Sequence, residues 1–204
     1  SNHYTIGAML QAPSIEKIDL HNIPDDKKLI RKALLLASQK ADVIITSGGV
    51  SVGKADFMKE VLSEIGKILF WKLAIKPGRP LAYGSINEAH YFGLPGNPVS
   101  AMVTFYQMVQ PAIRLLMGEQ GYTPPPKFKA KCTTTITKKP GRMEFQRAIL
   151  THDQDNLTVT PTRSQGSGIL SSMSEANCFI ILEMQHKTVE PGDLVDVQYM
   201  EGIV

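Results

Sequence analysis

The sequence predicts an α/β fold, with a mostly parallel sheet that helices cover on both faces, followed by a small β-barrel. From residue 16 to Gly118, short apolar runs alternate with amphipathic stretches, the usual order of strands and helices in such a sheet. A proline-rich segment then breaks this pattern, and only short strand-like segments follow it. We therefore predict two domains, residues 1–120 and residues 121–204.

The first helices and strands can be assigned in order. The chain opens with "SNHYTIGAML", which reads as a helix without a preceding strand and suggests a fragment. Ser1 and Asn2 are either cap residues or a remnant of cloning. Residues 25–41 predict an amphipathic helix, and residues 42–46, "DVIIT", a buried strand. The apolar face of that helix would consist of Leu29, Ile30, Ala33, Leu34 and Ala37.

The rest of the first half continues the alternation. Residues 57–66 predict a helix that Gly66 stops, and "ILFWKLAI", residues 68–75, predicts a strand. After the short apolar runs "LAYGSI" and "YFGL", a long helix should run from Pro98 to Gly118. Ligands of such folds gather at the carboxyl ends of the strands, so the loops there are the candidate sites.

The second half has strand character throughout. "EQGYTPPPKF", residues 119–128, predicts a stiff extended connector. Turn signals such as "KPGR", "DQDN" and "EPGD" then separate short segments rich in β-branched and aromatic residues, which predicts a small barrel or sandwich. These segments are "KAKCTTTIT", "MEFQRAILT", "LTVTPT", "CFIILEM" and "LVDVQYM".

Composition narrows the class of function. The formal charge of +3 is spread along the chain, which speaks against a nucleic-acid partner and a polybasic membrane segment. No apolar run approaches the roughly 20 residues that span a bilayer. Cys132 and Cys178 lie far apart with no metal-ligand spacing, as expected of packed thiols in a reducing compartment. We expect a soluble cytoplasmic protein without membrane or nucleic-acid partners, whose ligands are small anions.

The glycine-rich loop "TSGGVSVGKAD", residues 46–56, is the first candidate site. A P-loop needs a Ser or Thr directly after its lysine, and Ala55 stands there. An unspecific glycine turn is a second interpretation. We favour a third, an anion cradle, because glycine amides and hydroxyl groups precede a helix whose amino end attracts anions. Its members would be Ser47, Gly48, Gly49, Ser51 and Gly53.

Two further loops could bind anions. In "WKLAIKPGRP", residues 71–80, strand alternation puts Lys72, Ala74 and Lys76 on one face and Trp71, Leu73 and Ile75 on the other. By itself this reads as a solvated edge, but the stiff turn that carries Arg79 favours a site. "FGLPGNPVSA", residues 92–101, is either a capped turn or an anion-accepting helix start. That loop contributes Pro95, Asn97, Pro98 and Ser100.

Two acids complete the pattern. Asp25 precedes the helix at residue 27, and Asp56 closes the glycine loop. If both lie beside phosphate groups, a hard cation such as Mg²⁺ must lie between them. The alternative is that each carboxylate only caps the helix that follows it, and for Asp25 this is the simpler interpretation.

The three loops together, in this order and spacing, resemble the molybdopterin molybdenumtransferases, the MoeA family related to the carboxy-terminal domain of gephyrin. The resemblance extends to "IPDD", to "PGRMEFQRA" and to "SSMSEANCFIILE", and so covers nearly the whole chain. It implies a molybdopterin-binding α/β domain followed by a β-barrel. It also implies an activity, the Mg²⁺-dependent insertion of molybdate into adenylated molybdopterin with release of AMP.

The resemblance assigns roles to residues of this chain. Asp25 and Asp56 match acids near the metal and the adenylate, and are the implied catalytic and metal-binding residues. The glycine loop with Lys72, Lys76 and Arg79 would hold phosphate or molybdate. Pro95 and Pro98 would shape the pocket. Ser100 and Arg142 are similar to residues that help to hold molybdate.

The sequence also departs from the family. An earlier strand that ends in an acidic turn is missing, as are two amino-terminal domains, so we expect a sheet without its first strand. Lys54 stands where an acid is common. Full-length members would form homodimers and work with molybdopterin adenylyltransferase and other cofactor-biosynthesis proteins. The alternatives are such an adenylyltransferase, which lacks the barrel, or a gephyrin-like scaffolding module.

Overall fold

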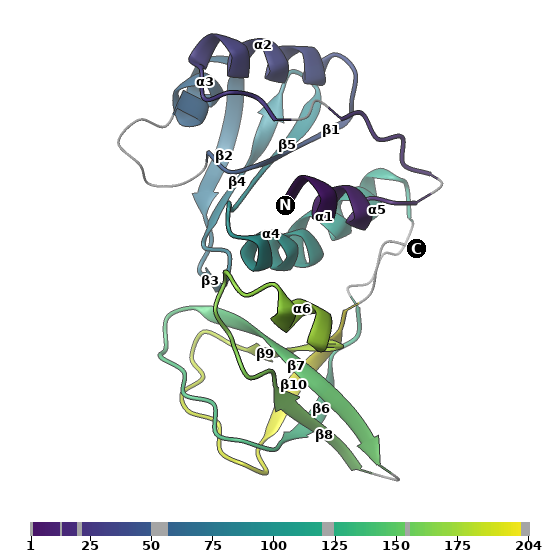
Figure 1. The fold of residues 1–204 in the computed structure, drawn as a ribbon, viewed down its shortest axis with the longest axis vertical. Helices are drawn as coiled ribbons and strands as arrows, with labels where there is room; N and C mark the ends of the chain where they lie inside the picture. The colour runs from purple at the N-terminus through teal and green to yellow at the C-terminus, as the bar shows by residue number, and fades with distance from the viewer. Residues whose placement is uncertain are drawn as a thin grey trace.

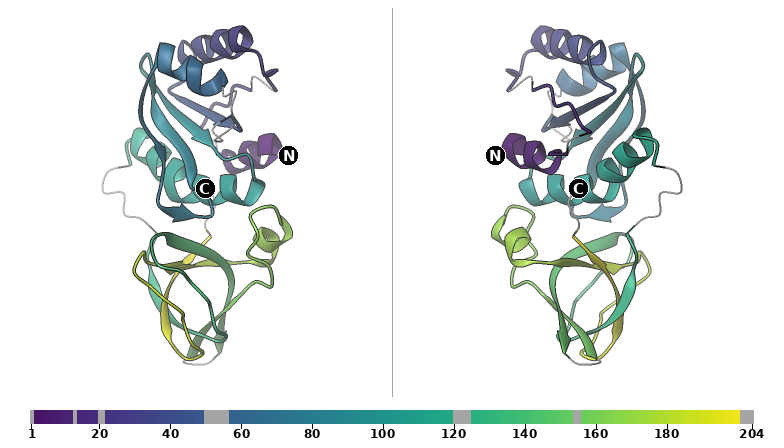
Figure 2. Two further views of the ribbon diagram at one scale, coloured as in Figure 1. Left: turned by 90° about the vertical axis from the view of Figure 1, so that its left-hand side faces the viewer. Right: turned by 90° about the vertical axis from the view of Figure 1, so that its right-hand side faces the viewer.

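A computed structural model describes residues 2–12, 14–19, 22–49, 57–119, 125–153 and 156–200. An α/β half and a β-barrel half lie one after the other along the long axis of the molecule (Figure 1). Side views show helices on both faces of the first sheet (Figure 2). The predicted domain boundary at residue 120 lies outside the described residues and stays a prediction. No described helix is both long and apolar enough to cross a membrane.

The first sheet is mixed. Its four strands have the order β1 (Val43–Ser47), β5 (Ala89–Leu94), β4 (Pro80–Ile86) and β2 (Gly66–Lys72). β1 and β5 are parallel, whereas β5 with β4 and β4 with β2 are antiparallel. The α/β class is confirmed, but the mostly parallel arrangement is not. The reason is local: the two residues between β4 and β5 can join only antiparallel neighbours.

Helices cover both faces of this sheet, as predicted. α2 (Lys27–Ser38) and α3 (Phe57–Ile65) pack on one face, and α1 (Asn2–Met9) and α4 (Pro98–Thr104) on the other. The first core contains Ile30, Leu34, Ile44, Val61, Leu62, Ala82, Ile86 and Tyr91. The second contains Ile6, Leu81, Phe92, Leu94, Ala101, Phe105, Val109 and Ile113. Leu29, predicted to face the first core, is 45% exposed.

The predicted long helix after Pro98 is divided into three parts. α4 passes into a π-helical turn, η1 (Phe105–Val109), and then into α5 (Gln110–Leu116). Pro111 lies just inside α5 and has no N–H to donate, so the regular α-helical pattern cannot continue through it. Gln107 of η1 donates a hydrogen bond of 2.9 Å to Gln198 of the barrel. The wider turn thus lies where the helix contacts the second half.

The strand predicted over residues 68–75 is two strands. β2 ends at Lys72, and the two-residue β3 (Ile75–Lys76) leaves the first sheet to pair with the barrel. β2 also shifts register twice against β4. Trp71 consequently packs in the core under α2 and α3, whereas Leu73 and Ile75 share a cluster on the other side. The prediction that these three side chains share one face is wrong, because alternation does not survive register shifts.

The second half is a closed five-stranded barrel rather than a sandwich, with neighbours in the order β6, β8, β7, β9, β10 and back to β6. β8 pairs only with the far part of β7, residues 148–153, so the beginning of β7 is open to β3. A short helix, α6 (Ser171–Glu175), lies between the barrel and α4 (Figure 1). The strands are β6 (Phe128–Cys132), β7 (Met143–Asp153), β8 (Asn156–Pro161), β9 (Cys178–Leu182) and β10 (Leu194–Tyr199).

The two cysteines are free thiols in the barrel core, as predicted for packed thiols. Burial raises the pKa of Cys178 from 9.0 to about 12. The unfolded chain therefore loses this proton at a lower pH than the folded chain. The resulting contribution to stability is fully present below pH 9 and is lost as the pH rises toward 12.

We predict that Cys178→Ala flattens the alkaline part of the stability profile. Between pH 8 and pH 10.5, the free energy of unfolding of the native sequence should fall by about 2 kcal/mol more than that of the variant. Urea denaturation at both pH values measures this difference. Equal slopes for the two proteins would contradict a proton held by Cys178.

Candidate functional site

The candidate site begins where β1 and β5 end. Because the two strands are parallel and Ser47 lies opposite Leu94, their carboxyl ends meet. The Gly48 amide donates to the Leu94 carbonyl at 3.1 Å, and Ser47 Oγ donates to the Pro95 carbonyl at 3.3 Å. The glycine loop and the Pro95 turn, far apart in the sequence, are therefore neighbours.

The first glycines of the loop use the backbone freedom that the sequence analysis assigned to them. Gly48 and Gly49 have φ values of 91° and 72°, in the region that favours glycine. A Cβ at Gly49 would also lie 3.0 Å from Met58 Cβ. Ser51, Gly53 and Asp56 lie outside the described residues, so their roles stay predictions.

Asn2 belongs to this site, although the sequence analysis did not place it there. Its Nδ2 donates to Ser47 Oγ at 2.6 Å and to the Gly96 carbonyl at 2.8 Å. Asn2 is the first residue of α1, and instead of capping its own helix its side chain joins the two loops. No local pattern reveals this, because the partners lie 45 and 94 residues away.

These loops form part of the wall of a cavity of about 1300 Å³. The wall also includes α1, α2, residues 14–19 and Asp25, as well as the flank of β1 that faces away from β5. The site residues in the wall are Asn2, Asp25, Ser47, Gly48, Gly49 and Gly96. The volume suits a ligand larger than a single phosphate.

Asp25 does not cap α2. The cap is Asp26, whose Oδ1 accepts hydrogen bonds from the amides of Lys28 at 2.8 Å and Leu29 at 2.9 Å. The capping alternative for Asp25 is therefore wrong, and its side chain is exposed at the cavity wall. Within the described ranges, no three His, Cys, Asp or Glu side chains form a metal-binding group. At phosphate sites Mg²⁺ takes one or two carboxylates, a number that Asp25 and Asp56 would supply.

The stiff turn of residues 73–80 lies against α4. The Leu73 amide donates to the Arg79 carbonyl at 2.9 Å, which closes the turn. Gly78 has a φ of 102°, and a Cβ there would lie 2.5 Å from Thr104 Cγ2 and 3.5 Å from the Ser100 carbonyl oxygen. Only glycine fits between this turn and the helix. The turn that carries Lys76 and Arg79 is thereby held beside the helix that carries Ser100.

Asn97 connects the first half to the barrel. It occupies the cap position of α4, yet its side chain makes no capping hydrogen bond. Instead, Asn97 Nδ2 donates to Ser167 Oγ at 3.1 Å. Ser167 was also missed by the sequence analysis, although its surroundings, "RSQGSG", have the small polar composition of an anion-binding loop.

Arg147 holds the barrel loop that carries Ser167. Its guanidinium donates to Ser172 Oγ and to the carbonyls of Ser164 and Gly166, at 3.2 to 3.4 Å. The residue is 1% exposed, and burial lowers the pKa of its guanidinium. The donors of this buried cation thus fix the path of residues 164–172.

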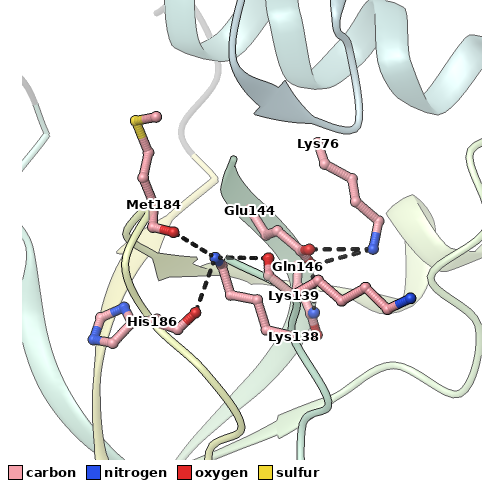
Figure 3. Close-up of polar contacts among 7 residues, drawn as sticks. All are labelled: Lys76, Lys138, Lys139, Glu144, Gln146, Met184 and His186. Atoms are coloured by element: carbon pink, nitrogen blue, oxygen red, sulfur yellow. Dashed lines mark hydrogen bonds and ion pairs between the residues drawn. The ribbon is translucent and has the colours of Figure 1, made fainter. Parts of the chain in front are cut away.

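The predicted site residues fall into two groups, and Lys72 lies apart from both. Ser47, Gly48, Gly49 and Asp25 lie at the cavity, and the turn of Pro95 to Pro98 lies next to them. Lys76 and Arg142 lie where the halves meet, because the Met143 amide donates to the Ala74 carbonyl and Lys76 Nζ contacts Glu144 (Figure 3). Lys72 ends β2, three strands from β1, which separates it from Ser47 by about 14 Å across the sheet.

Two family models match this chain. Residues 1–115, more than half of the chain, match the family model described as a probable molybdopterin binding domain. Residues 129–200 match the MoeA C-terminal region, domain IV. The chain belongs to the MoeA family. The resemblance recognised in the three loops is confirmed, and so is the pairing of an α/β domain with a barrel.

Relatives and solved structures extend this result. A molybdopterin molybdenumtransferase from Haemophilus influenzae is 44% identical over 97% of this chain and 49% of its own length. Gephyrin from Dictyostelium discoideum is 34% identical over 96% of this chain and 30% of its own. The structure of a MoeA protein from Pyrococcus horikosii superposes with a TM-score of 0.81 at 26% identity, over 99% of this chain and 48% of the other. This MoeA-family chain thus spans at most about half the length of these relatives.

We predict that Asn97 and Ser167 contribute to stability as a pair. Asn97→Ala and Ser167→Ala should each lower the free energy of unfolding by about 1 kcal/mol, and the double variant should lose less than the sum. Urea denaturation of the four proteins gives the coupling energy.

Ser38→Ala supplies the control, because Ser38 bonds to Asn87 on a different part of the molecule. Its effect should add to that of Asn97→Ala. Additive losses for Asn97 and Ser167 would show that their hydrogen bond does not hold the two halves together.

Proposed function

We propose that the protein to which this chain belongs inserts molybdate into adenylated molybdopterin and releases AMP, in a reaction that depends on Mg²⁺. One observation carries the proposal: the glycine loop and the Pro95 turn meet at the carboxyl ends of β1 and β5, in the wall of a large cavity that also includes Asp25. A relative with 44% identity bears the name of this activity.

The site residues that lie at the cavity would hold the adenylate. Backbone amides of the glycine loop, with the hydroxyls of Ser47 and Ser51, would donate to phosphate oxygens. Asp25 and Asp56 would hold Mg²⁺, which when bound offsets negative charge on the phosphate of the departing AMP. The size of the cavity would leave room for the organic part of the substrate.

The site residues that lie where the two halves meet would hold molybdate. Lys76, Arg79 and Arg142 carry positive charge on or beside the β3–β7 pair, where they would offset the repulsion between two anionic substrates. Ser100, at the start of α4, would help these residues to hold molybdate. Pro95 and Pro98 would fix the shape of the turn between the two groups, and Asn97 would keep it next to the barrel. Lys72 would act at most as a distant positive charge.

The whole protein would need more than this chain. We propose a homodimer in the cytoplasm that receives its substrate from a molybdopterin adenylyltransferase. An adenylyltransferase activity of this chain itself is less well supported, since that class lacks the barrel present here. A scaffolding role remains the second candidate, because gephyrin is among the relatives.

Isothermal titration of this chain with AMP and with molybdate, with and without Mg²⁺, tests the assignment. We predict that AMP binds only with Mg²⁺, and that Asp25→Asn or Asp56→Asn weakens this binding by at least about tenfold, because each removes a carboxylate ligand of the cation. Asp153→Asn, at the far end of β7, is the matched control and should leave binding unchanged.

Two outcomes would redirect the proposal. AMP binding that is equal with and without Mg²⁺ and in all variants would show that the two acids do not form a metal site. Capture of a partner protein that survives Asp56→Asn would favour the scaffolding role instead.

A further inference from the structure

A direct strand pair places one acid of the barrel against one lysine of the first half. β3 pairs in parallel with the beginning of β7, and Lys76 lies opposite Glu144 in this register. Residues opposite each other on paired strands project to the same face of the sheet. The position of Glu144 relative to Lys76 is therefore fixed by backbone hydrogen bonding and not only by the two side chains.

The contact between these side chains is close and asymmetric. Lys76 Nζ lies 3.2 Å from Glu144 Oε1 and 3.3 Å from Oε2, so it contacts both oxygens (Figure 3). The Glu144 side chain is 5% exposed, whereas that of Lys76 is 48% exposed. Gln146 Nε2 donates to Glu144 Oε2 at 3.0 Å and orients the carboxylate from its buried side. The ammonium can still meet a ligand from solvent, but the carboxylate is confined.

The neighbouring buried lysine, Lys138, forms no ion pair with this carboxylate. Lys138 is 4% exposed, and its Nζ donates to the carbonyls of Lys139, Met184 and His186, at 3.2 to 3.4 Å. An ammonium has three N–H groups, and these three acceptors use them (Figure 3). Among the ion pairs of the described residues, Lys76 is the one that matches the charge of Glu144.

We propose that Glu144 is a positioning residue that holds the Lys76 ammonium where the two halves meet and limits its affinity for oxyanions. An anion that approaches Lys76 meets a charge that a buried carboxylate already balances. The anion therefore binds weakly enough to be released, although the ammonium that binds it is held in a fixed position. The inference rests on the proposed function in taking an oxyanion as the ligand of Lys76.

The test measures molybdate binding by titration at low salt, with Glu144→Gln as the main variant. The amide is isosteric with the carboxylate, and its oxygen can still accept hydrogen bonds from Lys76 and Gln146. Asp196→Asn is the matched control, because it makes the same change in another ion pair of the barrel, with Lys129 at 2.9 Å. Lys76→Met combined with Glu144→Gln removes both charges and keeps the buried site neutral.

We expect Glu144→Gln to bind molybdate about three- to tenfold more tightly than the native sequence, with a gain that shrinks as salt is added. Asp196→Asn should not change the affinity, and the double variant should lose the gain. A purely structural role for Glu144 would instead weaken binding.

Every outcome of the molybdate titration either supports or overturns the inference. Unchanged or weaker molybdate binding by Glu144→Gln, or no binding by any variant, overturns the inference. Tighter binding by Glu144→Gln supports it even if the native sequence binds too weakly to detect. Failure of the proposed function would show separately, as AMP binding that is indifferent to Mg²⁺, Asp25 and Asp56.

Discussion

The relation between the two halves depends on a strand of two residues. Ile75 and Lys76 leave the first sheet and pair with the beginning of β7, where β8 does not reach. Ile75 then packs in a core that draws side chains from both halves: Val99, Val103, Phe145, Met173, Phe179 and Ile181. Close-packed interiors of this kind deform little, so the loops of the first half and of the barrel keep fixed positions relative to one another.

Polar contacts around this core set the same arrangement. Asn97 reaches Ser167, Gln107 reaches Gln198, and Lys76 reaches Glu144, each linking a residue of the first half to one of the barrel. A single hydrogen bond is worth about 1 kcal/mol. The shared core therefore supplies most of the stability of the contact between the two halves, and the polar contacts fix their relative orientation. A candidate site built from loops of both halves depends on this relative orientation, because a displacement of about 1 Å is enough to misplace a reacting group.

The buried charges of the barrel determine how the substitution of a lysine here affects stability. Arg147 and Lys138 are buried with neutral oxygen partners, whereas Glu144 is buried with a charged one. Removal of Lys76 alone would leave the buried Glu144 carboxylate without its counter-ion, which destabilises the folded chain. Reduced activity of a Lys76 variant would therefore mix lost ligand binding with lost stability. A paired change that also neutralises Glu144 separates the two effects.

The sequence by itself determined the elements that depend on local pattern. Helical periodicity placed α2 and α3, the glycines marked the loop after β1, and alternating segments with turn signals predicted the barrel. Three loops in order identified the family. Tertiary structure decided what depends on partners distant in the chain. β3 joined the barrel, Asp26 rather than Asp25 took the cap, and Asn2 and Glu144 acquired roles that their sequence neighbours do not signal. The small polar residues around Ser167 pointed to a binding loop, but not to its contact with Asn97. The reason is physical: a side chain's periodicity fixes which face it lies on, but only packing fixes what it meets there.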